Sequence, residues 1–126
     1  MNSKDNLSTG SLEKLLADET LLSLPEAAEL MGVPITRVYD LLTDRKLIAY
    51  VSDSGRCIPA SLFGGNTTTG KFVPGVITLL TDGGYSDVEI LEYLFTEDDS
   101  LPGRPVEALH GQLAREVVRR AQAMAI

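Results

Sequence analysis

The chain has few of the residues from which catalytic and metal sites are usually built. Its 126 residues include one cysteine, Cys57, and one histidine, His110. A single cysteine excludes an intrachain disulfide and a thiolate metal cluster, which agrees with a reducing compartment, and we expect it to pack in the fold. His110 lies in a Leu-His-Gly sequence typical of a helix end, where an imidazole satisfies terminal carbonyls or faces water. We therefore expect no enzymatic activity, no metal and no cofactor.

Long apolar runs are also absent. No stretch approaches the roughly 18 apolar residues that a transmembrane helix needs. Residues 1–10, MNSKDNLSTG, lack the apolar segment of a secretory signal. We therefore expect the protein in the cytoplasm, without a membrane partner.

Positive charge is scarce, with 11 Lys and Arg against 18 Asp and Glu and a net charge of −7. This opposes nucleic-acid binding over the whole surface, because Lys and Arg neutralise the phosphates. The distribution is uneven: residues 20–63 carry four basic and five acidic residues, whereas residues 71–126 carry five and nine. The four bases of residues 20–63 are Arg37, Arg45, Lys46 and Arg56. A local basic edge on an acidic protein is therefore expected.

Residues 23–32 have the pattern of a short amphipathic helix. Ser23 and Glu26 have capping-box spacing, and Pro25 falls in the first turn, where its missing N–H leaves no bond unmade. Gly32 can adopt the left-handed conformation that ends a helix. Between these signals the apolar residues recur at helical spacing, which predicts a buried stripe of Leu24, Ala27, Ala28 and Met31.

A second helix and a two-stranded wing are predicted to follow. With Ile35, Val38, Leu41 and Leu42 inward, and Leu30 buried beside them, the outer face of the helix carries Thr36, Arg37, Tyr39, Asp40 and Thr43. Residues 47–51 are β-branched and aromatic enough for a strand, residues 52–55 form a turn, and residues 56–58 return as a second strand. The sequence therefore predicts a winged helix-turn-helix, in which we expect Cys57 to pack in the wing.

The remainder of the chain divides around a polar linker. Residues 1–19 are interpreted as a flexible tail and a short helix that either lies on the winged domain of residues 20–63 or docks loosely. Residues 64–71 read as a hinge, since the P-loop-like spacing there lacks the Ser or Thr after Lys71 and the large α/β domain that nucleotide binding requires. Residues 72–126 predict a helical domain, with helices from Pro74 to Gly83, after a Ser86 cap, around Val106 and from Leu113 to Met124.

Residues 23–63 resemble the small excisionase and MerR-type helix-turn-helix domains. The matching residues include Glu26, Ala27, Ala28, Gly32, Val38, Tyr39, Arg56, Ile58 and Pro59. Over residues 23–126 the chain is similar to a small actinobacterial DNA-binding protein family that joins such a domain to a helical C-terminal domain. The stretches PGVITLLTDGGYSDVEILEYLF and RPVEALHGQLAREVVRRAQAMA carry this second resemblance. Pro34, where relatives have a Ser or Thr cap, and Asp40, where many have a basic residue, depart from the pattern.

The C-terminal part is also similar to the toxin-binding domain of some antitoxins. There a "LxGRxPxxLL" turn precedes the last helix, as LPGRPVEAL does here. This resemblance implies an alternative function, a protein-interaction module that binds a partner protein or a second copy of the chain. Candidate partner-binding residues are Arg104, Arg115 and Arg119, with ion pairing on a solvated helix face as the plainer reading of the last two. The acidic run Glu97 to Asp99 reads as a solvated loop, not a metal site.

These observations lead to one main hypothesis. We expect a mainly α fold with a small β-wing, a winged helix-turn-helix followed by a helical bundle domain. The expected function is double-stranded DNA binding and transcriptional regulation, with nucleoid association when bound. Phosphorylation of Ser8 or Thr9 by a Ser/Thr kinase would weaken binding, because it adds about −1.5 to −2 charge close to the bases. The expected DNA contacts are Thr36, Arg37, Tyr39, Arg45, Lys46 and Arg56.

Overall fold

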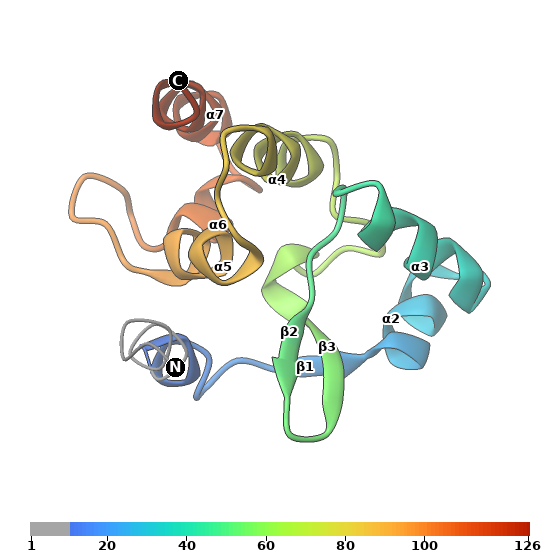
Figure 1. Ribbon diagram of the computed structural model, residues 1–126. Helices are drawn as coiled ribbons and strands as arrows, with labels where there is room; N and C mark the ends of the chain where they lie inside the picture. The colour runs from blue at the N-terminus through green and yellow to red at the C-terminus, as the bar shows by residue number, and fades with distance from the viewer. Residues whose placement is uncertain (1–10) are drawn as a thin grey trace.

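The computed structural model describes residues 11–126. A winged half and a helical half pack side by side, with the helix α3 (Ile35–Thr43) and the last helix, α7 (Ala114–Met124), at opposite ends of the molecule (Figure 1). Ser8 and Thr9, the predicted phosphorylation sites, lie outside the described residues. The prediction of a mainly α fold with a small antiparallel sheet is confirmed.

The winged half is built from two helices and a small sheet. Its elements are β1 (Leu21–Ser23), α2 (Leu24–Met31), α3 (Ile35–Thr43), β2 (Tyr50–Ser52), β3 (Gly55–Pro59) and the 3-10 turn η1 (Ala60–Leu62). The predicted start and end of α2 are confirmed: Ser23 and Glu26 form a reciprocal capping box, and Gly32 has a φ of 69°. Cys57 is buried in the wing, where its Sγ donates to the carbonyl of Tyr50 at 3.4 Å.

The sheet differs from the predicted two-stranded wing. β1 adds a third strand, so that the order is β1-β3-β2, and all neighbours are antiparallel. The expected strand over residues 47–51 begins only at Tyr50. Leu47 and Ile48 are instead buried in the connection from α3, each 1% exposed, because the amides of residues 46 and 47 still bond to the carbonyl of Leu41.

Four side chains predicted in the core lie partly or largely outside it: Leu30, Met31, Ile35 and Leu41. Leu30 is 38% exposed, because helical geometry places it at the edge of the buried stripe, about 60° from Ala27 and about 160° from Ala28. Ile35 is 36% exposed at the first residue of α3, and Leu41 is half-buried. Val38 and Leu42 are buried as predicted, so the phase of α3 is right and its apolar stripe is narrower than expected.

The helical half contains α4 (Phe72–Asp82), α5 (Asp87–Phe95), α6 (Pro105–Ala108) and α7 (Ala114–Met124). α5 begins at the predicted capping box of Ser86 and Glu89. α4 begins two residues before Pro74. α7 begins one residue after Leu113, where the helix was predicted to begin, and Leu113 is 39% exposed.

A single hydrophobic cluster runs through both halves. It contains Val38 and Ile58 of the winged half together with Leu80 and Leu94 of the helical half. Leu12 and Leu16 also belong to it, at 1% and 3% exposure, so the helical turn over residues 11–15 is packed instead of loosely docked. Among the described residues, no helix is long and apolar enough to cross a membrane.

Candidate nucleic-acid interface

The outer face of α3 is an exposed polar surface of the winged half. All five side chains predicted on this face are exposed: Thr36, Arg37, Tyr39, Asp40 and Thr43. Among the described residues, the side chain of Arg37 makes no hydrogen bond or ion pair, although Asp40 follows at the spacing that permits one. The face therefore presents polar groups that the fold itself does not use.

Arg56 connects this face to the wing. Its guanidinium lies 5.5 Å from the centre of the Tyr39 ring, across from α3 to β3. Arg56 pairs in register with Val51 on β2, whose side chain is 70% exposed. The contact between Arg56 and Tyr39 thus joins the exposed face of α3 to the wing.

The two bases after α3 differ in their surroundings. Arg45 donates from Nη1 to both carboxylate oxygens of Asp87 on α5, at 2.9 and 3.1 Å. Lys46, the next residue, makes no ion pair within residues 11–126. Of the two predicted DNA contacts, Lys46 is therefore the one whose charge the fold leaves unneutralised.

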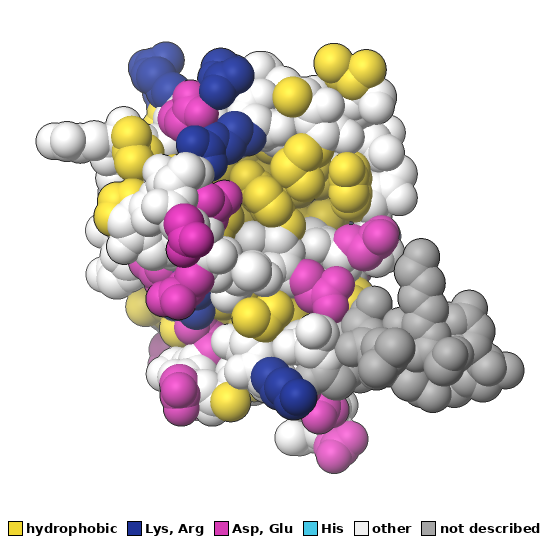
Figure 2. All heavy atoms as spheres, turned by 90° about the vertical axis from the view of Figure 1, so that its left-hand side faces the viewer, with side chains coloured by type: hydrophobic (Ala, Val, Ile, Leu, Met, Phe, Trp, Pro, Cys, Tyr) yellow, Lys and Arg dark blue, Asp and Glu magenta, His cyan; other side chains and the backbone are white. Residues whose placement is uncertain are grey.

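The face turned away from α3 is different in charge. Figure 2 shows hydrophobic side chains across its centre and scattered acidic side chains around them, with Lys and Arg gathered mainly at the top, over α7, around an acidic one. The contacts explain this group: Glu116 accepts from Arg119 at 2.7 Å and from Arg120 at 2.8 Å. These two hydrogen bonds lower the pKa of Glu116 to about 2.

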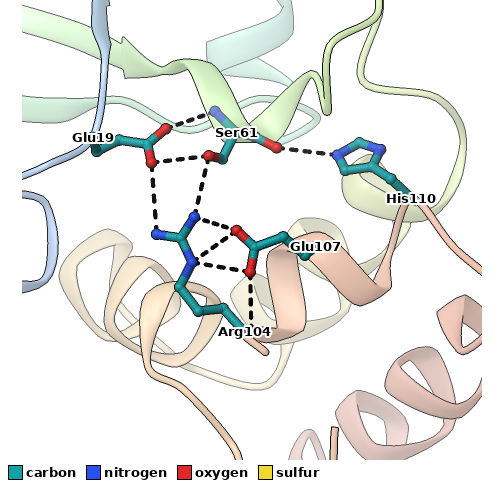
Figure 3. A network of polar contacts seen from close by, with 5 residues as sticks. All are labelled: Glu19, Ser61, Arg104, Glu107 and His110. Carbon is teal, nitrogen blue, oxygen red and sulfur yellow. Dashed lines mark hydrogen bonds and ion pairs between the residues drawn. The ribbon is translucent and has the colours of Figure 1, made fainter. Parts of the chain in front are cut away.

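Arg104 connects the two halves (Figure 3). Its guanidinium donates to Glu107 on α6 and, at 3.3 Å, to the hydroxyl of Ser61, and it lies 3.6 Å from Glu19. Glu19, whose side chain is only 6% exposed, also accepts from the amide and hydroxyl of Ser61 at 2.7 and 2.9 Å. The hydrogen bond from Arg104 is the main cause that lowers the pKa of Glu107. Arg104 thus anchors the helical half to the winged half.

His110 makes a second contact at this junction. Its Nε2 lies 3.1 Å from the carbonyl of Ser61, which can only accept, so this nitrogen carries the hydrogen (Figure 3). A Cβ on Gly64 would approach the His110 ring to 2.4 Å, so only glycine fits there. His110 was predicted to satisfy the carbonyls at the end of its own helix or to face water; it instead contacts a carbonyl of η1 in the winged half.

Sequence comparison assigns both halves. Residues 11–63 match the family described as "DNA-binding protein Rv2175c, wHTH domain", and residues 71–125 match "Rv2175c C-terminal domain of unknown function". The chain belongs to the Rv2175c family. The "DNA-binding protein Rv2175c" of Mycobacterium tuberculosis strain H37Rv is 45% identical over 120 residues, which cover 86% of this chain and 82% of that protein. The NMR structure of Rv2175c superposes with a TM-score of 0.78 over 86% of this chain and 83% of that one.

Membership of the Rv2175c family confirms the predicted resemblance to a small winged-helix family with a helical C-terminal domain. It does not test individual residues. Local sequence patterns did not indicate three residues whose contacts hold the two halves together: Glu19, Ser61 and Asp87. Each contacts a basic side chain more than 40 positions away, so no local spacing could have indicated them.

Proposed function

We propose that this protein binds double-stranded DNA through α3 and the wing and regulates transcription. The observation that carries the proposal is the exposed face of α3, which the contact of Arg56 with Tyr39 joins to the wing, and on which neither Arg37 nor Arg56 has a carboxylate partner among the described residues. The M. tuberculosis relative is named a DNA-binding protein, which supports the same function here. No catalytic role is part of the proposal.

The assignment of contacts follows from their positions. Thr36, Arg37 and Tyr39 lie on the exposed face of the helix that would enter the major groove, and Arg56 lies in the wing, where it would meet the backbone. Lys46 and Arg45 follow the helix, where flanking phosphates would lie. With three or four phosphate contacts per protomer, the logarithm of the binding constant should fall with the logarithm of salt at a slope of about −3.

Fluorescence titration of genomic fragments at two or more salt concentrations tests the proposal. Arg37→Ala, Tyr39→Ala and Arg56→Ala should each weaken binding while the melting curve is unchanged, because these side chains are exposed. Asp99→Asn, in the loop on the far side from α3 (Figure 1), is the control for a change of charge alone. A slope near zero for the intact protein would refute DNA binding.

We further propose that phosphorylation at Ser8 or Thr9 lowers DNA affinity. The described chain begins near the wing side of the molecule, away from α3 (Figure 1), so a ten-residue segment, at most about 33–36 Å when extended, has to reach the bases from there. A phosphate would add about −1.5 to −2 charge within that reach. Ser8→Glu, Thr9→Glu and deletion of residues 1–10 should differ in affinity at low salt, where screening is weakest; equal affinities would exclude this control.

The alternative, a C-terminal partner-binding module, is supported by one surface. An apolar groove between the Pro102–Gly103 turn and Leu113 leaves Leu113 39% exposed, next to α7 with Arg115 and Arg119. Arg104, the third candidate, is already engaged by Glu19 and Glu107. A toxin gene beside this one, or a self-association constant weakened by Leu113→Asp in sedimentation, would favour this alternative; a monomer without such a neighbour would count against it.

A further inference from the structure

The end of the recognition helix has an unusual capping residue. The amide of Lys46 donates to the carbonyl of Leu41 at 2.9 Å, and the amide of Arg45 donates to that of Leu42 at 3.3 Å. This is the bond pattern of a Schellman cap, whose left-handed position usually holds glycine or asparagine. Here Arg45 occupies it with a φ of 59°, the only positive φ of a non-glycine residue in the described part of the chain.

A side chain at such a position persists when the surroundings fix it. Two contacts from the helical half do so. Thr78 on α4 donates from its hydroxyl to the carbonyl of Arg45 at 2.9 Å. Asp87, at the first residue of α5, accepts twice from its guanidinium. The helical half, whose family is described as of unknown function, therefore holds both the backbone and the side chain of Arg45.

We propose that Arg45 is a positioning residue, through which Thr78 and Asp87 of the helical half fix the end of α3 and so its angle on DNA. The inference rests on the proposed use of α3 as the recognition helix. It gives Arg45 a role other than the phosphate contact expected from the sequence. It also gives the helical domain a part in DNA recognition that needs no DNA contact of its own.

The neighbouring residue supplies a matched comparison. Lys46 has the same charge, is exposed and makes no ion pair among the described residues, so it represents what a phosphate contact would look like. Replacing a phosphate-contacting base should reduce the salt slope by about 0.9 and weaken binding alike on all sequences. Loss of a positioning residue should leave the slope unchanged and weaken binding to the preferred fragment most.

The variants are Asp87→Asn, Arg45→Asn and the double change, with Lys46→Ala and Asp99→Asn as controls. Asparagine tolerates the left-handed conformation at position 45, and Asp87→Asn leaves the Ser86–Glu89 capping box in place. In the free protein, hydrogen exchange of the amides at residues 44–47 should be about 2–5-fold faster in both single variants, the factor expected for losing an exposed ion pair. Asp99→Asn should not change it.

On DNA, both single variants should lose about 2–5-fold in affinity for the preferred genomic fragment, with the double variant no weaker than either, because they break one contact. Lys46→Ala alone should change the salt slope. The inference is overturned if Arg45→Asn lowers the slope as Lys46→Ala does, if Asp87→Asn strengthens binding, or if exchange at residues 44–47 is unaltered. Should the wild type bind no DNA, the proposed function fails, while the exchange measurement still decides whether the helical half holds this cap.

Discussion

The two halves of the molecule differ in how many of their basic residues are paired with carboxylates. In the helical half, Arg104, Arg119 and Arg120 pair with carboxylates, and the guanidinium of Arg115 and the ammonium of Lys71 lie over the ring of Phe72. Of the four bases in residues 20–63, Arg45 is the one with a carboxylate partner in the described structure.

This contrast shows why net charge is a poor guide to the function of this protein. A chain of charge −7 repels DNA as a whole, but each paired arginine of the helical half is locally neutral, whereas Arg37, Lys46 and Arg56 retain their charge for a ligand. Phosphate neutralisation depends on such unpaired bases and falls off within a Debye length, about 8 Å at physiological salt. Four sets of amino-acid substitutions test this difference between the halves.

The largest expected effect concerns the core that the halves share. Leu94 on α5 is fully buried in the cluster that also contains Val38 and Ile58 of the winged half. Leu94→Ala should lower the free energy of unfolding by about 2–5 kcal/mol through lost contacts and a residual cavity. Because the cluster is continuous, urea unfolding should remain a single transition. Two separate transitions would show that the halves fold independently, and Leu30→Ala, at a 38% exposed site, should change stability little.

The next effect concerns the polar junction. Arg104→Gln would leave Glu19, 6% exposed, and Glu107 without their guanidinium, and a charged group that loses its partner costs about 1.5–3 kcal/mol. Arg119→Gln is the matched control, because Arg119 pairs with Glu116 in an exposed setting on α7. Chemical denaturation of both variants measures the difference. Equal shifts of the midpoint would mean that Arg104 is an ordinary surface arginine and does not connect the halves.

The local features of this fold were predictable from the sequence, and the long-range ones were not. Both capping boxes, at Ser23 and at Ser86, were found because their partners lie three residues away. The strand β1 was missed, since three residues give no alternation to recognise and its pairing with β3 spans the whole winged half. The prediction that Leu30 is buried is wrong, because an apolar residue beside a stripe in the sequence can lie at its exposed edge.

The same distinction between local and long-range features applies to the candidate site. The exposed face of α3 followed from helical periodicity, so Arg37 and Tyr39 were found. The pairing of Arg45 with Asp87 depends on how α5 packs against the winged half, 42 positions along the chain, and no spacing rule encodes it. Arg104, a predicted partner-binding residue, contacts Glu19 and Ser61 of the winged half, and no spacing in the sequence indicates these two residues.

A smaller effect, on the pH dependence of stability, is expected from Glu116 on α7. The pKa of Glu116 is lowered from 4.5 to about 2 by hydrogen bonds from Arg119 and Arg120. A carboxylate whose folded pKa lies below its unfolded one adds stability above the unfolded value, and that stability is lost as pH falls towards the folded value. Between pH 4.5 and about 2 the melting temperature of Glu116→Gln should therefore fall less steeply than that of the wild type. Glu97→Gln, in the solvent-exposed loop, should follow the wild type, and identical slopes for all three would contradict the pairing.

The smallest expected effect compares two arginines held over aromatic rings, one in each half. Arg56 lies 5.5 Å from the ring centre of Tyr39, and Arg115 lies 6.0 Å from that of Phe72. Both lack a carboxylate partner among the described residues, so they differ mainly in position.

If only the winged surface meets DNA, Arg56→Ala should reduce the magnitude of the salt slope by about 0.9, whereas Arg115→Ala should leave it unchanged. Neither change should alter folding by more than the 0.5–1 kcal/mol or so that an exposed cation–π contact contributes, which thermal melts would check. Equal reductions would extend the DNA surface across Phe72 to α7, and the helical half would then contact DNA directly instead of acting only through the end of α3.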